Sequence, residues 1–243
     1  MSRFGEAEDP RRRLLIQALA AGFFMDGLGR TEALAQLLGS TPAKLPAGRS
    51  IYRVSGTAMV DGKPATLETR VGGRSTLETG RNSELVYAVG ESAFVLRSES
   101  RIVLETAQPD SVILSGLRVL SGKILSVFAS KRPVQIRAAT ATIGIRGTGV
   151  YIEADPEQTY FCTCYGVADI ASASDPESQE TVAALHHDRP VYVTSNGQPG
   201  RNIRSAPFIN HTDQELMLIE ALVGRQPPFV FPKSDYTGPR RNY

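Results

Sequence analysis

The chain has 243 residues, of which 41% are hydrophobic and 21% are charged, a composition sufficient for one folded domain with a sizeable core. Its formal net charge is only +2, so the sequence predicts no nucleic-acid partner, because a dedicated nucleic-acid binder needs a strong positive field. With only 2 cysteines, the chain is not a disulfide-rich scaffold.

Residues 1–35 have the pattern of an export signal. Three arginines at residues 11–13 precede an apolar run over residues 14–25, which is shorter than the roughly 20 residues of a membrane-spanning helix. The paired arginines before a moderately apolar run also resemble a twin-arginine signal. Ala33 and Ala35 have the small-x-small spacing of a signal-peptidase site.

The same segment has a second interpretation. Asp9 and Pro10 suit the N-cap and the first position of a soluble amphipathic helix, and Asp26 interrupts the apolar run. We expect export to the periplasm, with the segment either cleaved near Ala35 or retained as the only contact with the membrane. Residues 36–48, rich in proline, glycine and alanine, are expected to form a linker.

Residues 49–195 predict an all-β domain, because short runs of β-branched and aromatic residues alternate with turn signals. Asp61 and Gly62 form a hairpin-type turn signal. The spacing suits a β-sandwich, a roll or a solenoid-like stack, and the absence of a fixed repeat leaves these alternatives open. In the first half, strands are expected at residues 51–60, 65–71, 85–89, 94–96 and 102–104.

The densest apolar pattern lies at residues 112–170. Apolar residues alternate there with small or polar ones, and Gly116 and Gly122 are expected to divide the run into separate strands. Further strands are expected around residues 134–138, 143–145, 150–152 and 159–165.

Residues 196–243 are expected to be a C-terminal extension that contains one helix at about residues 213–223. Thr212 and Glu215 have the spacing of a capping box, in which the two side chains satisfy amide groups at a helix start. Apolar residues then recur at helical spacing, and Gly224 supplies a stop.

Three segments, residues 117–125, 132–137 and 142–148, have an order and spacing that resemble the FecR domain. The most specific part is an Arg-Gly-Thr step followed by an apolar strand and then by a strand that ends near a glycine. The resemblance covers about residues 50–172. The residues of this family motif are Gly122, Arg146, Gly147, Thr148 and Gly166.

The motif is expected to form a structural corner rather than a ligand site. Gly147 lies between two predicted strands, which indicates a backbone position that a Cβ atom would strain. Arg146 is expected to brace the turn by hydrogen bonding to carbonyl groups.

The resemblance also implies a function. Well-known members of the family lie in the periplasm and are joined by one transmembrane helix to a cytoplasmic anti-sigma segment. Here the region before the apolar run is too short for such a segment. The resemblance therefore implies a stand-alone exported module that is not catalytic and that binds an envelope protein or a glycan.

The cysteines and histidines form a candidate metal site. Cys162 and Cys164 lie two residues apart on a predicted strand, so their side chains face the same way and are poorly placed to form a disulfide with each other. Thiolates with imidazoles favour zinc or copper, and His186, His187 and His211 are the available imidazoles. The alternative is that the cysteines are small core residues and the histidines serve turns or caps.

The sequence predicts no enzymatic activity and no cofactor other than this metal. Ser92 lacks the closing glycine of a nucleophile elbow. A dyad of Cys164 with His186 or His211 is conceivable, but nothing local in the sequence indicates an activated thiolate.

Overall fold

The computed structural model describes residues 43–108, 111–129 and 132–229. The expected export signal and its helix, most of the expected linker and the end of the C-terminal extension lie outside the described residues. The chain divides into two units, Met1–Ser40 and Thr41–Tyr243, and the account below concerns the second. Within the described residues, no helix has the length and apolar character needed to cross a membrane.

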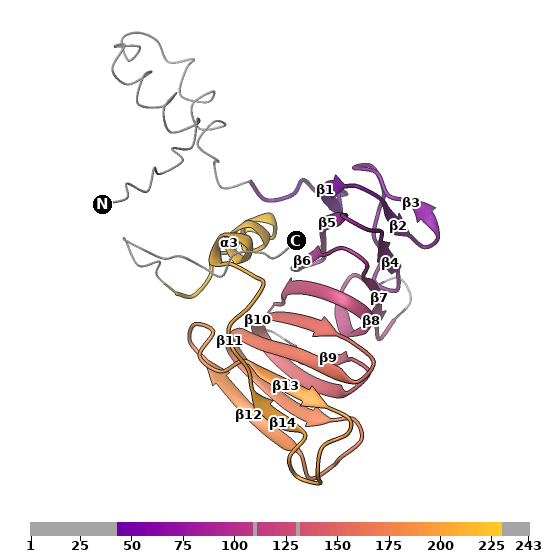
Figure 1. Ribbon diagram of the computed structural model, residues 1–243. Helices are drawn as coiled ribbons and strands as arrows, with labels where there is room; N and C mark the ends of the chain where they lie inside the picture. Colours follow the sequence, from indigo (N-terminus) through magenta and orange to yellow (C-terminus); the bar gives the residue numbers. More distant parts are fainter. Residues whose placement is uncertain (1–42, 109–110, 130–131, 230–243) are drawn as a thin grey trace, which may run out of the picture. The chain divides into compact units, whose positions relative to one another are not determined.

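The described part is an all-β fold with one C-terminal helix, as the sequence predicts (Figure 1). The strands are β1 (Ile51–Ser55), β2 (Ala58–Val60), β3 (Lys63–Pro64), β4 (Thr76–Thr79), β5 (Glu84–Val89), β6 (Ser92–Leu96), β7 (Arg101–Thr106), β8 (Leu114–Val127), β9 (Val134–Arg137), β10 (Ala141–Ala154), β11 (Gln158–Ser172), β12 (Gln179–Ala184), β13 (Val191–Thr194) and β14 (Ile203–Ser205). Helix α3 (Asp213–Leu222) follows them.

The long strands β8, β10 and β11 organise the sheet, because each has different neighbours along its two halves. The first half of β8 pairs with β7 and β9, and its second half pairs with β6 and β10. The first half of β11 pairs with β13, and its second half pairs with β12. The 14-stranded ladder therefore folds into two halves, one containing β1, β5, β6, β13 and β14 and the other containing β2, β3, β4, β7, β9 and β12.

Glycines mark the bends of these long strands but do not interrupt them. Gly122, Gly147 and Gly166 all have positive φ angles, of 84°, 58° and 94°. A Cβ atom on Gly166 would meet the Cγ2 atom of Thr148 at 2.3 Å, so the close approach there requires glycine. The expectation that Gly116 and Gly122 divide their run is wrong, because β8 is continuous, with Gly116 paired to β7 and Gly122 paired to β10.

Two other strand predictions were also wrong. The run at residues 51–60 is split between β1 and β2 at Gly56, which has a positive φ of 69°. Residues 65–71 form no strand, because the hydroxyl groups of Thr66 and Thr69 accept hydrogen bonds from nearby backbone amides and hold a turn. Strand pairing also continues beyond residue 195, to Ser205.

Arg146 differs from its expected role. Its side chain is 74% exposed, and the partner found for it is the carboxylate of Asp169, 4.0 Å away. Bracing of the corner therefore falls to the backbone pairing around Gly147, where the register of β10 against β11 shifts between Arg146 and Gly149.

The apolar residues form two clusters on opposite faces of the half that contains β5 and β6. Tyr87 and Phe94 belong to the larger cluster, whereas their neighbours Val86 and Val95 belong to the second. This alternation follows from the period-two geometry of a strand. Helix α3 covers the second cluster with Leu216, Ile219 and Leu222. The predicted capping box of Thr212 and Glu215 is confirmed.

Candidate metal centre

Four of the five predicted ligand residues converge beneath the segment that leads into α3. Cys162 and Cys164 project from the same face of β11, His187 lies in the loop between β12 and β13, and His211 precedes α3. Their four ligand atoms lie within 4.8 Å of one another. All four residues are buried, with the two cysteines and His211 at 0% exposure and His187 at 8%.

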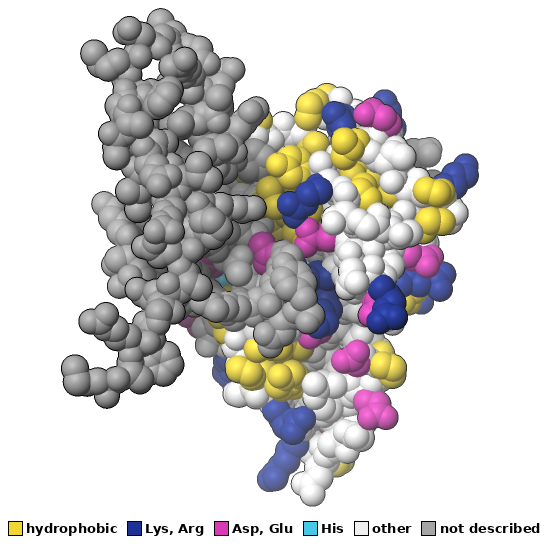
Figure 2. Space-filling view, turned by 45° about the horizontal axis from the view of Figure 1, so that its top comes forward, with side chains coloured by type: hydrophobic (Ala, Val, Ile, Leu, Met, Phe, Trp, Pro, Cys, Tyr) yellow, Lys and Arg dark blue, Asp and Glu magenta, His cyan; other side chains and the backbone are white. Residues whose placement is uncertain are grey.

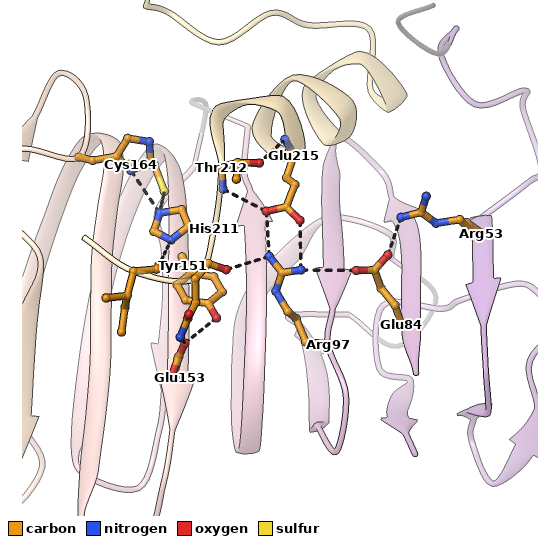
Figure 3. A network of polar contacts seen from close by, with 12 residues as sticks. Arg53, Glu84, Arg97, Tyr151, Glu153, Cys164, His211, Thr212 and Glu215 are labelled. Atoms are coloured by element: carbon orange, nitrogen blue, oxygen red, sulfur yellow. Dashed lines mark hydrogen bonds and ion pairs between the residues drawn. The ribbon is translucent and has the colours of Figure 1, made fainter. Parts of the chain in front are cut away.

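Three of the distances between these atoms are close to the edges of a coordination tetrahedron. The Nδ1 atom of His187 lies 3.5 Å from the Cys162 sulfur and 3.2 Å from the Nε2 atom of His211. The Cys164 sulfur lies 3.4 Å from the same Nε2 atom (Figure 3). A tetrahedral zinc ion at its usual bond lengths separates a sulfur and a nitrogen ligand by about 3.5 Å and two nitrogen ligands by about 3.3 Å.

Hydrogen bonds on the outer side of each imidazole direct a nitrogen lone pair toward the centre. The Nε2 atom of His187 lies 2.9 Å from a carboxylate oxygen of Asp213. The Nδ1 atom of His211 donates to the carbonyl of Ile209 over 2.7 Å. Because both outer partners are acceptors, each ring carries a lone pair on its inner nitrogen once that nitrogen is deprotonated, the arrangement that outer carboxylates and carbonyls give to metal-bound histidines.

The backbone is in an unusual conformation beside both histidine ligands. His187 has a positive φ of 55°, and Asn210, which precedes His211, has a positive φ of 59°. The carboxylate of Asp188 holds the first turn by accepting hydrogen bonds from the amides of Leu185 and His186. Left-handed conformations of non-glycine residues are costly and concentrate at functional sites.

The inner nitrogens of His187 and His211 lie 3.2 Å apart, and a proton on one of them allows a hydrogen bond between the two rings. Burial acts against charge on His187, but hydrogen bonds to Asp213 and Cys162 outweigh it and raise the pKa of this imidazole to about 9. Burial likewise opposes the thiolate of Cys162, yet hydrogen bonds from Cys164, His187 and His211 hold its pKa well below the usual value. Burial raises the pKa of Cys164 and lowers that of His211. These directions favour a thiolate at Cys162 beside a protonated imidazole at His187.

Cys162, His187 and Asp213 also follow the order of nucleophile, base and orienting acid in a thiol hydrolase. The Cys162 side chain, however, has 0% exposure, and its sulfur faces a second thiol and a second imidazole. The geometry is therefore better suited to enclosing an ion than to attacking a substrate.

His186 is the one predicted ligand that lies outside the group of four. Its Nε2 atom is 2.9 Å from the other carboxylate oxygen of Asp213, and its side chain is 31% exposed. Asp213 therefore accepts hydrogen bonds from two histidines. The sequence pattern did not predict Asp213 as part of the site. Its place two residues after His211, in the first turn of the predicted helix, was the available signal.

A buried ionic network adjoins the centre (Figure 3). The guanidinium of Arg97 donates to both carboxylate oxygens of Glu215 over 3.1 and 2.9 Å, and to the carbonyl of Asn210 over 3.1 Å. It also contacts the carboxylate of Glu84 at 3.4 Å. The ring of Tyr151 stacks on His211 with the centroids 4.4 Å apart, and the Arg97 guanidinium carbon lies 5.7 Å from the same ring.

The comparisons with known proteins leave the family open. No family and no curated protein matches the chain. Two crystal structures of a "putative anti-sigma factor" from Parabacteroides distasonis ATCC 8503 align with it, each at 13% sequence identity and a TM-score of 0.43. The alignments cover 54% and 58% of this chain, and 58% and 70% of those chains.

The chain thus spans less than two thirds of the first of these structures, with 58% of it covered. A likeness of this size assigns no function, and the FecR resemblance stays a prediction.

Proposed function

We propose that the protein binds one zinc ion through Cys162, Cys164, His187 and His211. The observation that carries the proposal is the convergence of two thiols and two imidazole lone pairs at tetrahedral spacing, with Asp213 and the Ile209 carbonyl supporting the two rings. Two sulfur and two nitrogen ligands in tetrahedral geometry favour zinc, and copper is the alternative metal.

The proposed centre is structural or sensory rather than catalytic. Four protein ligands fill the coordination shell of zinc, whereas catalytic zinc sites keep a position for water or substrate. The ligands come from β11, the loop before β13 and the segment before α3. An ion at this point would fasten the C-terminal segment to the sheet, so metal binding and docking of α3 would depend on each other.

A direct test is equilibrium dialysis of the reduced full-length protein against zinc, with the bound metal measured by mass spectrometry. One ion per chain is expected. Cobalt substitution should give the intense visible absorption of a tetrahedral thiolate site. The variants Cys162→Ser, Cys164→Ser and His187→Gln should lose the bound ion, because each removes one of the four ligands.

Two control variants make the test specific. His186→Gln should keep one ion per chain, because His186 is not among the four grouped ligand residues and its Nε2 atom pairs with Asp213. Thr163→Val should also keep it, because Thr163 lies between the two cysteines and its buried hydroxyl has no hydrogen-bond partner within the described part. A folded, reduced wild-type protein that retains no metal, or a His187→Gln variant that binds as well as the wild type, would contradict the proposal.

We further propose that this metal-binding fold serves as a non-catalytic binding or signalling module outside the cytoplasm, as the FecR resemblance implies. The support is the export pattern of residues 1–35 together with the all-β fold. Replacement of Arg12 and Arg13 by lysine should retain the protein in the cytosol if a twin-arginine route exports it. Fractionation of cells that express the two forms measures this, and periplasmic recovery of the lysine form would exclude that route.

A further inference from the structure

A polar cavity of about 870 Å³ lies beside the ionic network, between β1, β5, β6 and the segment before α3. This volume falls within the range of roughly 300–1,000 Å³ that is typical of ligand sites. Hydroxyl and amide groups supply much of the lining, through Ser55, Asn82, Ser83, Ser98 and Asn210. These groups offer hydrogen-bond donors and acceptors to a ligand.

The charged side chains that line the cavity all lie in ion pairs, including Glu99, which contacts Arg81 at 4.0 Å. Arg53 contacts Glu84 at 2.5 Å, and Glu84 contacts Arg97 at 3.4 Å. On the other side of the cavity, Lys123 contacts Glu153 at 3.5 Å. Basic and acidic side chains are also interspersed on the coloured part of the surface in Figure 2. A ligand with a strong net charge would find no excess of opposite charge here, whereas a neutral ligand could hydrogen-bond to these fixed pairs.

We propose that this cavity binds a neutral saccharide and that the zinc centre holds its inner wall in place. Saccharide hydroxyls both donate and accept, so they can pair with the serine hydroxyls and with the amide groups of Asn82 and Asn210. The dependence on zinc rests on the proposed function, and the saccharide site does not.

Asn210 connects the two sites. It precedes the ligand His211, its carbonyl accepts a hydrogen bond from Arg97, and its side-chain amide donates to Glu153 over 2.6 Å. Tyr151 lines the cavity and stacks on His211. Fixing His211 on an ion therefore fixes two parts of the cavity wall, and releasing the ion allows both to move.

The test titrates maltotriose, cellotriose and triacetylchitotriose into the zinc-loaded full-length protein, with a trimer of galacturonic acid as the charged comparison. Binding is followed by calorimetry and by amide chemical shifts. We expect at least one neutral trisaccharide to bind and to shift the amides of Asn82, Ser98 and Asn210. No binding by any neutral trisaccharide, or tighter binding of the charged trimer, would overturn the saccharide proposal.

Two variants locate the binding. Ser55→Trp fills the cavity and should weaken binding at least about tenfold. Ser115→Trp places the same side chain on an exposed position of β8 outside the cavity and should leave the affinity unchanged. Asn82→Asp is a second cavity variant, in which the new side chain has nearly the size of the original one. It should also weaken binding, and it replaces Ser55→Trp in the test if that variant fails to fold. Equal affinity in a cavity variant and the control would overturn the assignment.

Removal of zinc with a chelator tests the link between the sites. Saccharide affinity should fall several-fold and recover when zinc is restored. An affinity that stays constant while zinc is lost would overturn the coupling. If dialysis shows that the chain binds no zinc, the proposed function fails, and titration of the purified protein with the same trisaccharides still decides whether the cavity is a saccharide site.

Discussion

Replacement of Arg97 by methionine should destabilise the protein strongly, because this guanidinium joins the sheet to the segment before α3. Arg97, Glu84 and Glu215 have side-chain exposures of only 10%, 13% and 11%, so water compensates little for the lost contacts. Breaking a buried ion pair by removing one partner costs about 3–5 kcal/mol. In this variant Glu84 retains its ion pair with Arg53, and Glu215 retains its hydrogen bond from the amide of Thr212. The expected loss of unfolding free energy is therefore at the lower end of this range, about 3 kcal/mol.

For a domain of this size, the expected loss corresponds to a fall in melting temperature of about 6–12 °C. Urea unfolding followed by circular dichroism measures the free energy of unfolding. The control Arg146→Met removes an exposed arginine with an ion pair at 4.0 Å and should cost less than about 0.5 kcal/mol. A loss below about 1 kcal/mol for Arg97→Met, or full additivity with Glu215→Gln, would refute the reasoning, because contacting residues normally show coupling of about 0.5–3 kcal/mol.

Zinc at about a thousand times its dissociation constant should stabilise the wild-type protein by about 4 kcal/mol. Calorimetric scans should show this gain disappear in Cys164→Ser, and equal gains in both proteins would count against the ligand role. Gly166→Ala should be destabilising by more than about 2 kcal/mol, since a Cβ atom would lie 2.3 Å from Thr148 at a φ of 94°; near-wild-type urea midpoints would contradict this. Hydrogen bonds from Ser178 and Asn202 lower the pKa of Asp175 from its ordinary value of 3.8 to about 2. The folded pKa is below the unfolded one, so this stabilisation is complete above pH 3.8 and is lost as the pH falls to about 2. Urea midpoints across that window should fall more steeply in the wild type than in Asp175→Asn, and parallel curves would show that Asp175 is not responsible.

Local sequence patterns predicted much of the secondary structure. The alternation at residues 85–89 and 94–96, the turn at Asp61 and the capping box of Thr212 each depend on residues a few positions apart, and each appears in the structure. The failures also have local causes. Glycine inside a strand can bend it without ending it, so residues 112–128 were read as several strands although β8 is continuous.

The candidate site could be predicted only in part. The spacing of Cys162 and Cys164 on one strand placed both thiols on one face, and the short list of histidines supplied the remaining ligands. Which histidines join the thiols could not be predicted, because adjacent residues of a loop point in different directions. His187 faces the thiols because its backbone takes a left-handed conformation, whereas His186 faces Asp213.

By itself, the sequence determined the fold class, the helix start and the shared direction of the two thiols, because each depends on contacts between near neighbours in the chain. Only the tertiary structure decided that His187 and His211 meet those thiols, that Asp213 supports His187 and that Arg97 ties the segment before α3 to β6. These contacts join residues far apart in the sequence. They depend on where β8, β10 and β11 bend and on how the segment before α3 docks, and no short stretch of sequence contains that information.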